Sequence, residues 1–168
     1  AEKMRSRISR LVSTTGPDAA GLTTWALSNG VQVVLKPTTF REDEILVRAT
    51  SPGGTSLARD EDYVPASTAV QVVTAGGLGK LSADDVKKVL TGKTVSVTPI
   101  FGELEEGLTG NSSRRDVETL FQLIYLRFTQ PRRDDTAFAV LTDQMKSTLA
   151  GQAVNPGFAF NELLLATR

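Results

Sequence analysis

Two short alternating apolar segments separated by Ser28-Asn29-Gly30 constrain the fold of this chain more than any other feature. Asn and Gly accept the positive φ angles of a tight turn, so the pattern predicts a β-hairpin whose second strand ends at Pro37. Two strands joined in this way are antiparallel. The alternating residues are Trp25 and Leu27 before the turn and Val31, Val33 and Leu35 after it.

The rest of the chain alternates between short strand patterns and longer helical patterns. Hairpin-joined strands with helices set apart from them predict an α+β fold, in which an antiparallel sheet carries helices packed on one face. The predicted strands are about 44–51, 95–100 and 102–110, the last with Leu104 and Leu108 on one face. The predicted helices are a buried helix over 66–75, a helix capped by Ser82 with the stripe Val86, Val89 and Leu90, a helix capped by Ser113 with the stripe Val117, Leu120, Phe121, Ile124 and Phe128, and a last helix from Asp134 or Asp135 to about Ala150 with the stripe Phe138, Leu141, Met145 and Leu149.

Length and patterning predict one domain over 22–168, preceded by a linker or frayed arm over 1–21. The arm shows no clear hydrophobic period, and a short basic helix at its start is the alternative. Near the C-terminus the apolar patch Leu163-Leu164-Leu165 has little sequence after it to pack against, so we expect an incomplete, truncated domain. The basic residues of the arm are Lys3, Arg5, Arg7 and Arg10.

Composition excludes several classes of site. The chain contains no cysteine and no histidine, so thiolate nucleophiles, Cys or His metal ligands and a His general base are absent. Its 19 basic residues are balanced by 19 acidic ones, which gives no broad attraction for nucleic acid. No apolar run reaches the roughly 20 residues that span a bilayer. We therefore expect no nucleic-acid partner and no membrane span.

The glycine-rich stretch Gly76-Gly77-Leu78-Gly79-Lys80 lacks the pattern of a phosphate-binding loop. Thr74 stands where the first glycine is required, and Leu81 stands where a magnesium-binding hydroxyl is required. We interpret the stretch as a flexible connection between two helices.

Other polar groups offer weaker candidates for chemistry. Ser56 and Lys80 are formally available as a Ser–Lys dyad, but no spacing supports it, and surface residues are the simpler interpretation. The acidic clusters 60–62 and 103–106 lack the regular spacing of a calcium loop. We expect the first cluster to be a solvated loop.

Several segments together resemble the pitrilysin/insulinase family of zinc metalloproteases, over about Thr24 to Pro156. Bacterial members with two halves are the nearest comparison, and there the combination resembles the first domain of the C-terminal half. The resemblance implies a mitochondrial-processing-peptidase-like fold, in which one α+β domain is repeated and two halves close around a peptide-holding chamber. The matching segments are Trp25–Pro37, Asp43–Leu46, Ser51–Leu57, Leu90–Lys93 and Gly110–Arg132, including Thr119-Leu120-Phe121-Gln122-Leu123-Ile124-Tyr125-Leu126.

The same resemblance implies that this domain is not catalytic. The catalytic repeat of the family carries His-x-x-Glu-His, in which two imidazoles bind zinc and the Glu activates water. Here the corresponding helix reads Ser67-Thr68-Ala69-Val70-Gln71, with Ser67 and Gln71 at the ligand positions and Val70 at the position of the base. We therefore expect no catalytic residue, cofactor or metal in this chain, and zinc in the N-terminal half of the parent protein.

What the resemblance implies about function is a non-catalytic fragment of a zinc-dependent metalloendopeptidase, acting as chamber wall and scaffold for peptide substrate. Its partners would be the other domains of its parent chain and the parent's peptide substrate. A periplasmic or otherwise exported location in a bacterium is favoured for the parent. The alternative is a structural or interaction protein of the same fold without peptidase activity. A third hypothesis is an unrelated enzyme that uses carboxylates or Ser–Lys chemistry.

Overall fold

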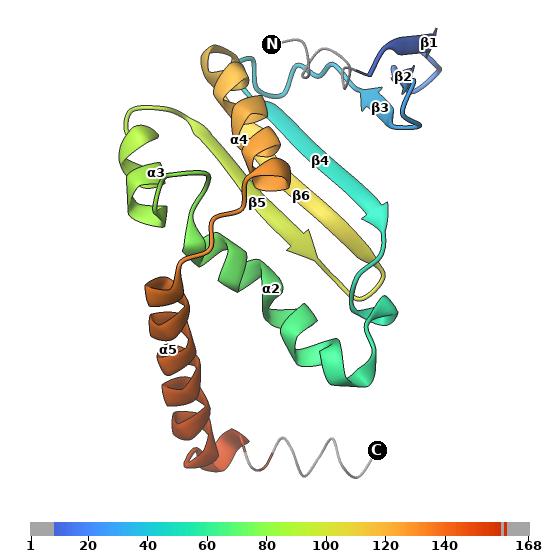
Figure 1. The fold of residues 1–168 in the computed structure, drawn as a ribbon. Coiled ribbons are helices and arrows are strands. Elements are labelled where there is room, and N and C mark those ends of the chain that lie inside the picture. The colour runs from blue at the N-terminus through green and yellow to red at the C-terminus, as the bar shows by residue number, and fades with distance from the viewer. Residues whose placement is uncertain (1–8, 159, 161–168) are drawn as a thin grey trace. The chain divides into compact units, whose positions relative to one another are not determined.

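The computed structural model describes residues 9–158 and 160, and the chain divides into two compact units, Ala1–Asp43 and Glu44–Arg168. The first unit contains an antiparallel sheet of three strands in the order β1-β2-β3 (Figure 1). The predicted hairpin is confirmed: Gly30 has a φ of 86°, and the Leu27 N–H donates to the Val31 carbonyl at 2.9 Å. The strands are β1 (Leu11–Thr15), β2 (Thr23–Leu27) and β3 (Gln32–Leu35).

Strand β1 lies inside the segment for which the sequence predicts a linker or frayed arm over 1–21. It pairs with β2 from Leu11 opposite Leu27 to Thr15 opposite Thr24, so the arm prediction does not hold for Leu11–Thr15. All five residues of β1 are exposed, which explains why no hydrophobic period marks the strand. The predicted single domain over 22–168 is also divided in the structure, between Asp43 and Glu44.

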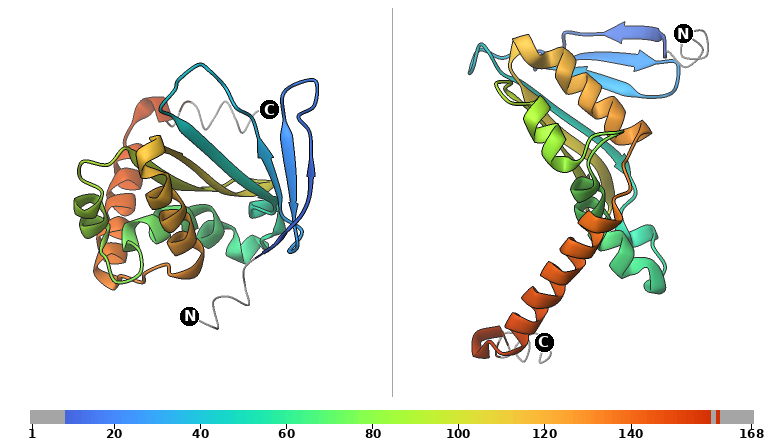
Figure 2. Two further views of the ribbon diagram at one scale, coloured as in Figure 1. Left: turned by 90° about the horizontal axis from the view of Figure 1, so that it is seen from above. Right: turned by 60° about the vertical axis from the view of Figure 1, so that its left-hand side comes forward.

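The second unit is a three-stranded antiparallel sheet with helices on one face, so the predicted α+β fold is confirmed. The strand order is β4-β6-β5, and Figure 2 shows α2 and α4 on the same face of this sheet. The strands are β4 (Ile45–Pro52), β5 (Val95–Phe101) and β6 (Glu105–Ser112); the helices are α2 (Tyr63–Gly76), α3 (Ala83–Val89), α4 (Val117–Thr129) and α5 (Asp135–Ala153); short 3-10 turns are η1 (Thr55–Leu57), η2 (Asp60–Asp62) and η3 (Arg114–Asp116).

Helix ends in this unit are closed by the side chains that the sequence predicts. Ser82 and Asp85 form a capping box at the start of α3, and Ser113 accepts a hydrogen bond from the Asp116 N–H at 3.2 Å ahead of α4. The Asp134 carboxylate accepts from the Ala137 N–H at 2.9 Å at the start of α5. Each cap satisfies backbone N–H groups that have no partner inside the helix.

The hydrophobic core lies between α4 and the sheet and includes one residue from the glycine-rich stretch. Leu78 is 2% exposed, and its N–H donates to the Leu81 carbonyl at 2.9 Å. The interpretation as a flexible connection is therefore wrong, because Leu78 anchors this turn in the core. Gly77 permits the turn, since its φ is 91° and an added Cβ would lie 2.7 Å from the Ser82 carbonyl carbon. The buried core residues are Leu78, Val97, Leu108, Leu120 and Leu123.

Several residues of the predicted apolar stripes are exposed rather than buried. In α4 the buried face passes through Leu120 and Leu123, whereas Phe121 and Phe128 are largely exposed. Helix α2 was predicted to be buried, but of its residues only Gly76 is. Leu163 to Leu165 lie outside the described residues. The exposed members are Val89, Leu104, Phe121, Phe128, Phe138 and Leu149.

No helix within residues 9–158 and 160 combines the length and the apolar character needed to cross a membrane.

Candidate functional site

Helix α2 carries the three residues that the sequence comparison predicts at the family's zinc-site positions. Ser67 and Gln71 lie one turn apart and are exposed, and Val70 is half-buried. The Ser67 hydroxyl donates to the Val64 carbonyl at 3.0 Å, so its hydrogen bond lies within α2. A hydroxyl, an isopropyl group and an amide do not replace two imidazoles and a carboxylate on zinc. This donor set does not fit the metal.

The acidic residues of the described chain do not form a metal site. No group of three or more His, Cys, Asp or Glu side chains able to hold an ion occurs within residues 9–158 and 160. In the cluster 60–62, Arg59 pairs with Glu61 at 2.6 Å and with Asp62 at 2.8 Å. In the second cluster, Glu105 pairs with Arg48 at 2.6 Å. The carboxylates nearest these arginines are engaged in surface ion pairs.

The Ser56–Lys80 dyad is ruled out by the position of α2 between its members. Ser56 lies in η1, before the helix, and its hydroxyl donates to the Gly53 carbonyl at 3.4 Å. Lys80 lies in the turn after the helix. A helix of 14 residues is about 21 Å long at about 1.5 Å per residue, so the hydroxyl and the amine are far from hydrogen-bond distance.

The inner face of α2 lines a cavity of about 160 Å³ between this helix, the sheet and α4. We call it the α4 cavity. Val70, which the sequence comparison predicts at the position of the family's base, belongs to its wall, together with one charged residue, Arg127 of α4. The lining residues are Ala69, Val70, Val73, Pro99, Gly107, Leu108, Arg127 and Phe128.

Arg127 is the residue of this cavity that sequence reasoning missed. Its Nε and Nη1 atoms are buried and have no hydrogen-bond acceptor in the described structure. Burial lowers the pKa of the Arg127 guanidinium from its ordinary value, although it stays charged at neutral pH. A signal was present in the sequence, because Arg127 follows Leu120 by seven residues and Leu123 by four, which places it on the buried face of α4.

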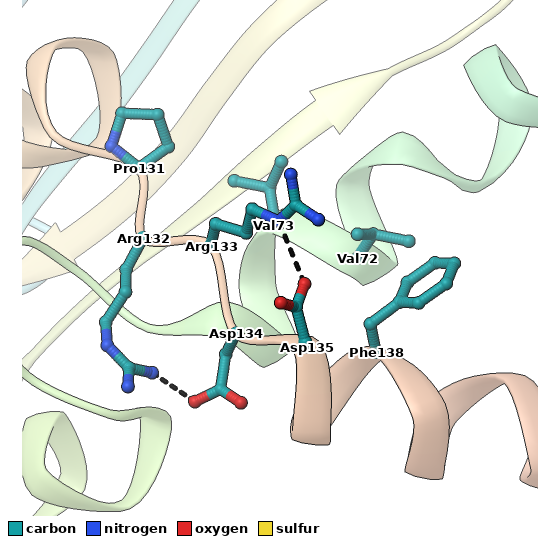
Figure 3. Close-up of a pocket in the computed structure, with 8 residues that line it drawn as sticks. All are labelled: Val72, Val73, Pro131, Arg132, Arg133, Asp134, Asp135 and Phe138. Carbon is teal, nitrogen blue, oxygen red and sulfur yellow. Dashed lines mark hydrogen bonds and ion pairs between the residues drawn. The ribbon is translucent and has the colours of Figure 1, made fainter.

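A second hollow, of about 440 Å³, lies between α2 and the start of α5 (Figure 3). We call it the α5 groove; Val72, Val73 and Phe138 supply its apolar wall. Its charged residues are already paired, Arg132 with Asp134 and Arg133 with Asp135, the latter at 2.8 Å. The Arg132 guanidinium also donates to the Gly76 carbonyl at 2.9 Å, so these charges hold the α4–α5 connection.

The carboxylate buried in the described structure lies at the start of α4 and is structural. Asp116 is 4% exposed, and its Oδ2 accepts from the Thr94 N–H at 2.9 Å and from the Ser113 hydroxyl at 2.9 Å. These hydrogen bonds, the Thr94 bond first, lower the pKa of Asp116 below its ordinary value. The group ties the start of β5 to the start of α4.

Two curated proteins are similar to this chain in sequence. It is 26% identical to the probable zinc protease PqqL of Haemophilus influenzae over 120 residues, which are 71% of this chain and 13% of that protein. It is 25% identical to the probable zinc protease PqqL of Escherichia coli over 150 residues, 89% of this chain and 16% of that protein. No protein-family model matches the chain.

Two solved structures share its fold. The periplasmic protease PqqL from Escherichia coli superposes with a TM-score of 0.80 and 23% identity over 96% of this chain and 18% of that one. A variant of the ferredoxin protease FusC in complex with Arabidopsis ferredoxin superposes with a TM-score of 0.76 and 21% identity over 93% of this chain and 17% of that one.

The chain therefore spans less than a fifth of each protein that it matches. The two PqqL proteins are named as zinc proteases, and the match covers most of this chain. In sequence and in fold, this chain is therefore similar to a stretch of zinc proteases of the pitrilysin/insulinase type.

Proposed function

We propose that this chain is a non-catalytic part of a zinc-dependent peptidase and forms part of the wall of a chamber that holds peptide. The observation that carries the proposal is the donor set of α2. Ser67, Val70 and Gln71 occupy the positions at which the resembling family binds zinc and activates water. The sequence relatives are nevertheless named as zinc proteases. The catalytic ion then belongs to another domain of the parent.

The same relationship supports proposals about the parent protein. We place the zinc in its N-terminal half, where a His-x-x-Glu-His motif would supply ligands and base. We also place the parent in the periplasm, as the Escherichia coli PqqL structure is described as that of a periplasmic protease. The FusC structure holds ferredoxin, which supports a chamber that accepts polypeptides. In this arrangement the other domains of the parent are the chain's main partners.

The direct test is metal content and activity of the 168-residue chain. After purification without chelators, we expect far less than one zinc per chain by atomic spectroscopy, because no His or Cys is available. We also expect no cleavage of a quenched fluorescent peptide when zinc is added. Stoichiometric zinc, or hydrolysis that a chelator abolishes, would contradict the proposal.

A gain-of-function variant tests whether α2 has the geometry of a zinc-binding helix and lacks only the ligands. The triple variant Ser67→His, Val70→Glu and Gln71→His places two imidazoles one turn apart on an exposed helix face. We expect this variant to bind zinc at micromolar or lower concentration, measured by competition with a chromogenic chelator. The matched control Ser67→Asn, Val70→Gln and Gln71→Asn should not bind. Equal zinc binding by the two variants would show that residues 67 and 71 do not present a pair of zinc ligands on α2.

The parent gene separates the peptidase from a structural protein of the same fold. A His-x-x-Glu-His motif in the half that precedes this chain supports the peptidase. Its absence there would favour a structural or interaction role.

A further inference from the structure

The α4 cavity contains a charged group that the described protein leaves without an acceptor. Among its lining residues, Arg127 is the single charged one, and no carboxylate lines the cavity. The Nε and Nη1 atoms of Arg127 have no hydrogen-bond partner among the described residues. Arg48 of the same unit shows the contrast, because its guanidinium pairs with the Glu105 carboxylate at 2.6 Å.

Two nitrogen atoms of the Arg127 guanidinium, Nε and Nη1, are shielded from solvent without an acceptor among the described residues, although the residue as a whole is partly exposed. A buried donor without an acceptor costs stability, and the cost is larger when the group is charged. Arginine does not escape this cost by losing its proton at neutral pH. The position is therefore one at which an acceptor supplied from outside the described residues is bound with a favourable free energy.

The wall of the cavity defines the chemistry of that acceptor. Apart from Arg127, it consists of aliphatic and aromatic side chains, proline and glycine. A volume of about 160 Å³ is well above the roughly 10–15 Å³ that a single water molecule needs. A glutamate side chain has five non-hydrogen atoms, of which the methylene carbons suit the apolar wall. Its carboxylate accepts charge-assisted hydrogen bonds from the guanidinium.

We propose that the α4 cavity binds an acidic side chain of a peptide held by the parent protein, with Arg127 as its anchor. The proposal rests on the peptide-holding role proposed above and adds a preference for acidic residues to it. Val70 then contributes to binding, because its isopropyl group forms part of the apolar wall beside the bound side chain. Arg127 acts in binding and has no part in hydrolysis.

The test is a pair of peptides that differ in one side chain. The capped peptides acetyl-Ala-Ala-Glu-Ala-Ala-amide and acetyl-Ala-Ala-Gln-Ala-Ala-amide are titrated into the 168-residue chain labelled with ¹⁵N. The Nε–Hε resonance of Arg127 reports hydrogen bonding to the guanidinium directly. We expect the glutamate peptide to bind about 10- to 100-fold more tightly than the glutamine peptide, as charged hydrogen bonds contribute. We also expect a downfield shift of this resonance with the glutamate peptide alone.

Two variants identify the residue responsible. Arg127→Met keeps the length of the side chain without its charge and should abolish the preference for glutamate. Lys80→Met removes one positive charge from an exposed position outside the cavity and should change either affinity by less than about twofold, since exposed charges are screened. The circular dichroism spectrum establishes that each variant is folded. The shift of the Arg127 Nε–Hε resonance is measured in the unmodified chain, so this test does not depend on the folding of a variant.

Equal affinities for the two peptides, no binding of either, or an unchanged preference in Arg127→Met would each overturn this proposal. None of these results bears on the zinc and hydrolysis tests of the proposed function. Conversely, stoichiometric zinc in the chain would defeat the proposed function and leave a measured glutamate preference standing.

Discussion

The two ends of α4 differ in whether their charged side chains have hydrogen-bond partners. At the start of the helix, Asp116 is 4% exposed and accepts hydrogen bonds from the Thr94 N–H and the Ser113 hydroxyl, both at 2.9 Å. Near its end, Arg127 has two buried nitrogen atoms without an acceptor in the described residues. One helix thus carries a charged group that is hydrogen-bonded inside the domain and another with buried donors that lack an acceptor among the described residues.

The difference separates what holds this domain together from what it offers to other molecules. A buried polar group that is fully paired fixes local geometry, and removing a partner costs stability. A buried group without a partner costs stability by being present, so the domain alone gives no reason to keep it. The start of α4 is therefore structural, and its end is the part of the helix at which we expect binding.

The comparison requires a helix that is firmly packed between its two ends, and Leu120 provides that packing. Leu120 is 0% exposed, so Leu120→Ala should lower the free energy of unfolding by about 3–5 kcal/mol through lost burial and a cavity. Phe121→Ala is the matched control, because Phe121 is 58% exposed and its loss should cost less than about 1 kcal/mol. Urea denaturation measures both; equal losses would mean that α4 faces the sheet differently.

The next largest effect tests the structural end. Asp116→Ala leaves the Thr94 N–H and the Ser113 hydroxyl without their acceptor, and we expect the melting temperature to fall by roughly 5 °C or more. Asp116→Asn retains one acceptor oxygen and should lose less. Thermal denaturation followed by circular dichroism distinguishes the two variants. If Asp116→Ala has the same melting temperature as the unmodified chain, Asp116 does not stabilise the start of α4.

At the other end, the sign of the effect should reverse. Arg127→Met replaces a partly exposed guanidinium, two of whose nitrogen atoms are buried without an acceptor among the described residues, by an apolar side chain of similar length, and we expect the free protein to gain up to about 1 kcal/mol. For a chain of this size, the melting temperature should rise by up to about 2–4 °C. Arg127→Lys keeps a charge in the cavity and should show no such gain. Clear destabilisation by Arg127→Met would reveal an acceptor within the domain.

The smallest effect is the pH dependence contributed by Asp116. Its pKa in the folded chain is lowered, chiefly by the Thr94 N–H, from an unfolded value of about 3.9. The unfolded chain therefore binds the proton more tightly, and the stabilisation is complete above about pH 4 and is lost as the pH falls through the folded pKa. The stability difference between the unmodified chain and Asp116→Asn should narrow below pH 4. A difference that is constant from pH 6 to pH 2.5 would contradict this linkage.

Much of the fold was predictable because local signals agreed with tertiary packing. The Asn29-Gly30 turn, the Ser82 and Ser113 caps and the alternation of β5 each specify an element without reference to the rest of the chain. Strand β1 was missed, since all of its residues are exposed and it exists by pairing with β2. The faces of the helices were only partly predicted, because several apolar positions fit each helical stripe and the packing against the sheet selects among them.

The candidate site was predictable in what it lacks and not in what it contains. Ser67, Val70 and Gln71 can be assigned from a family resemblance along the chain. The α4 cavity joins residues from α2, β5, β6 and α4, and no spacing within one segment shows that Val70 and Arg127 share a wall. The position of Arg127 on the apolar face of its helix was visible in the sequence, but its lack of a partner required the structure.

The strand order β4-β6-β5 leaves the two borders of this sheet chemically unequal. Pro99 lies within β5 and has no N–H to offer to a further strand, whereas β4 from Ile45 to Ser51 contains no proline. Sheet extension by backbone pairing is therefore favoured along β4 and hindered along β5. A neighbouring module that continued the ladder would join through β4, which would give the assembly a direction of growth.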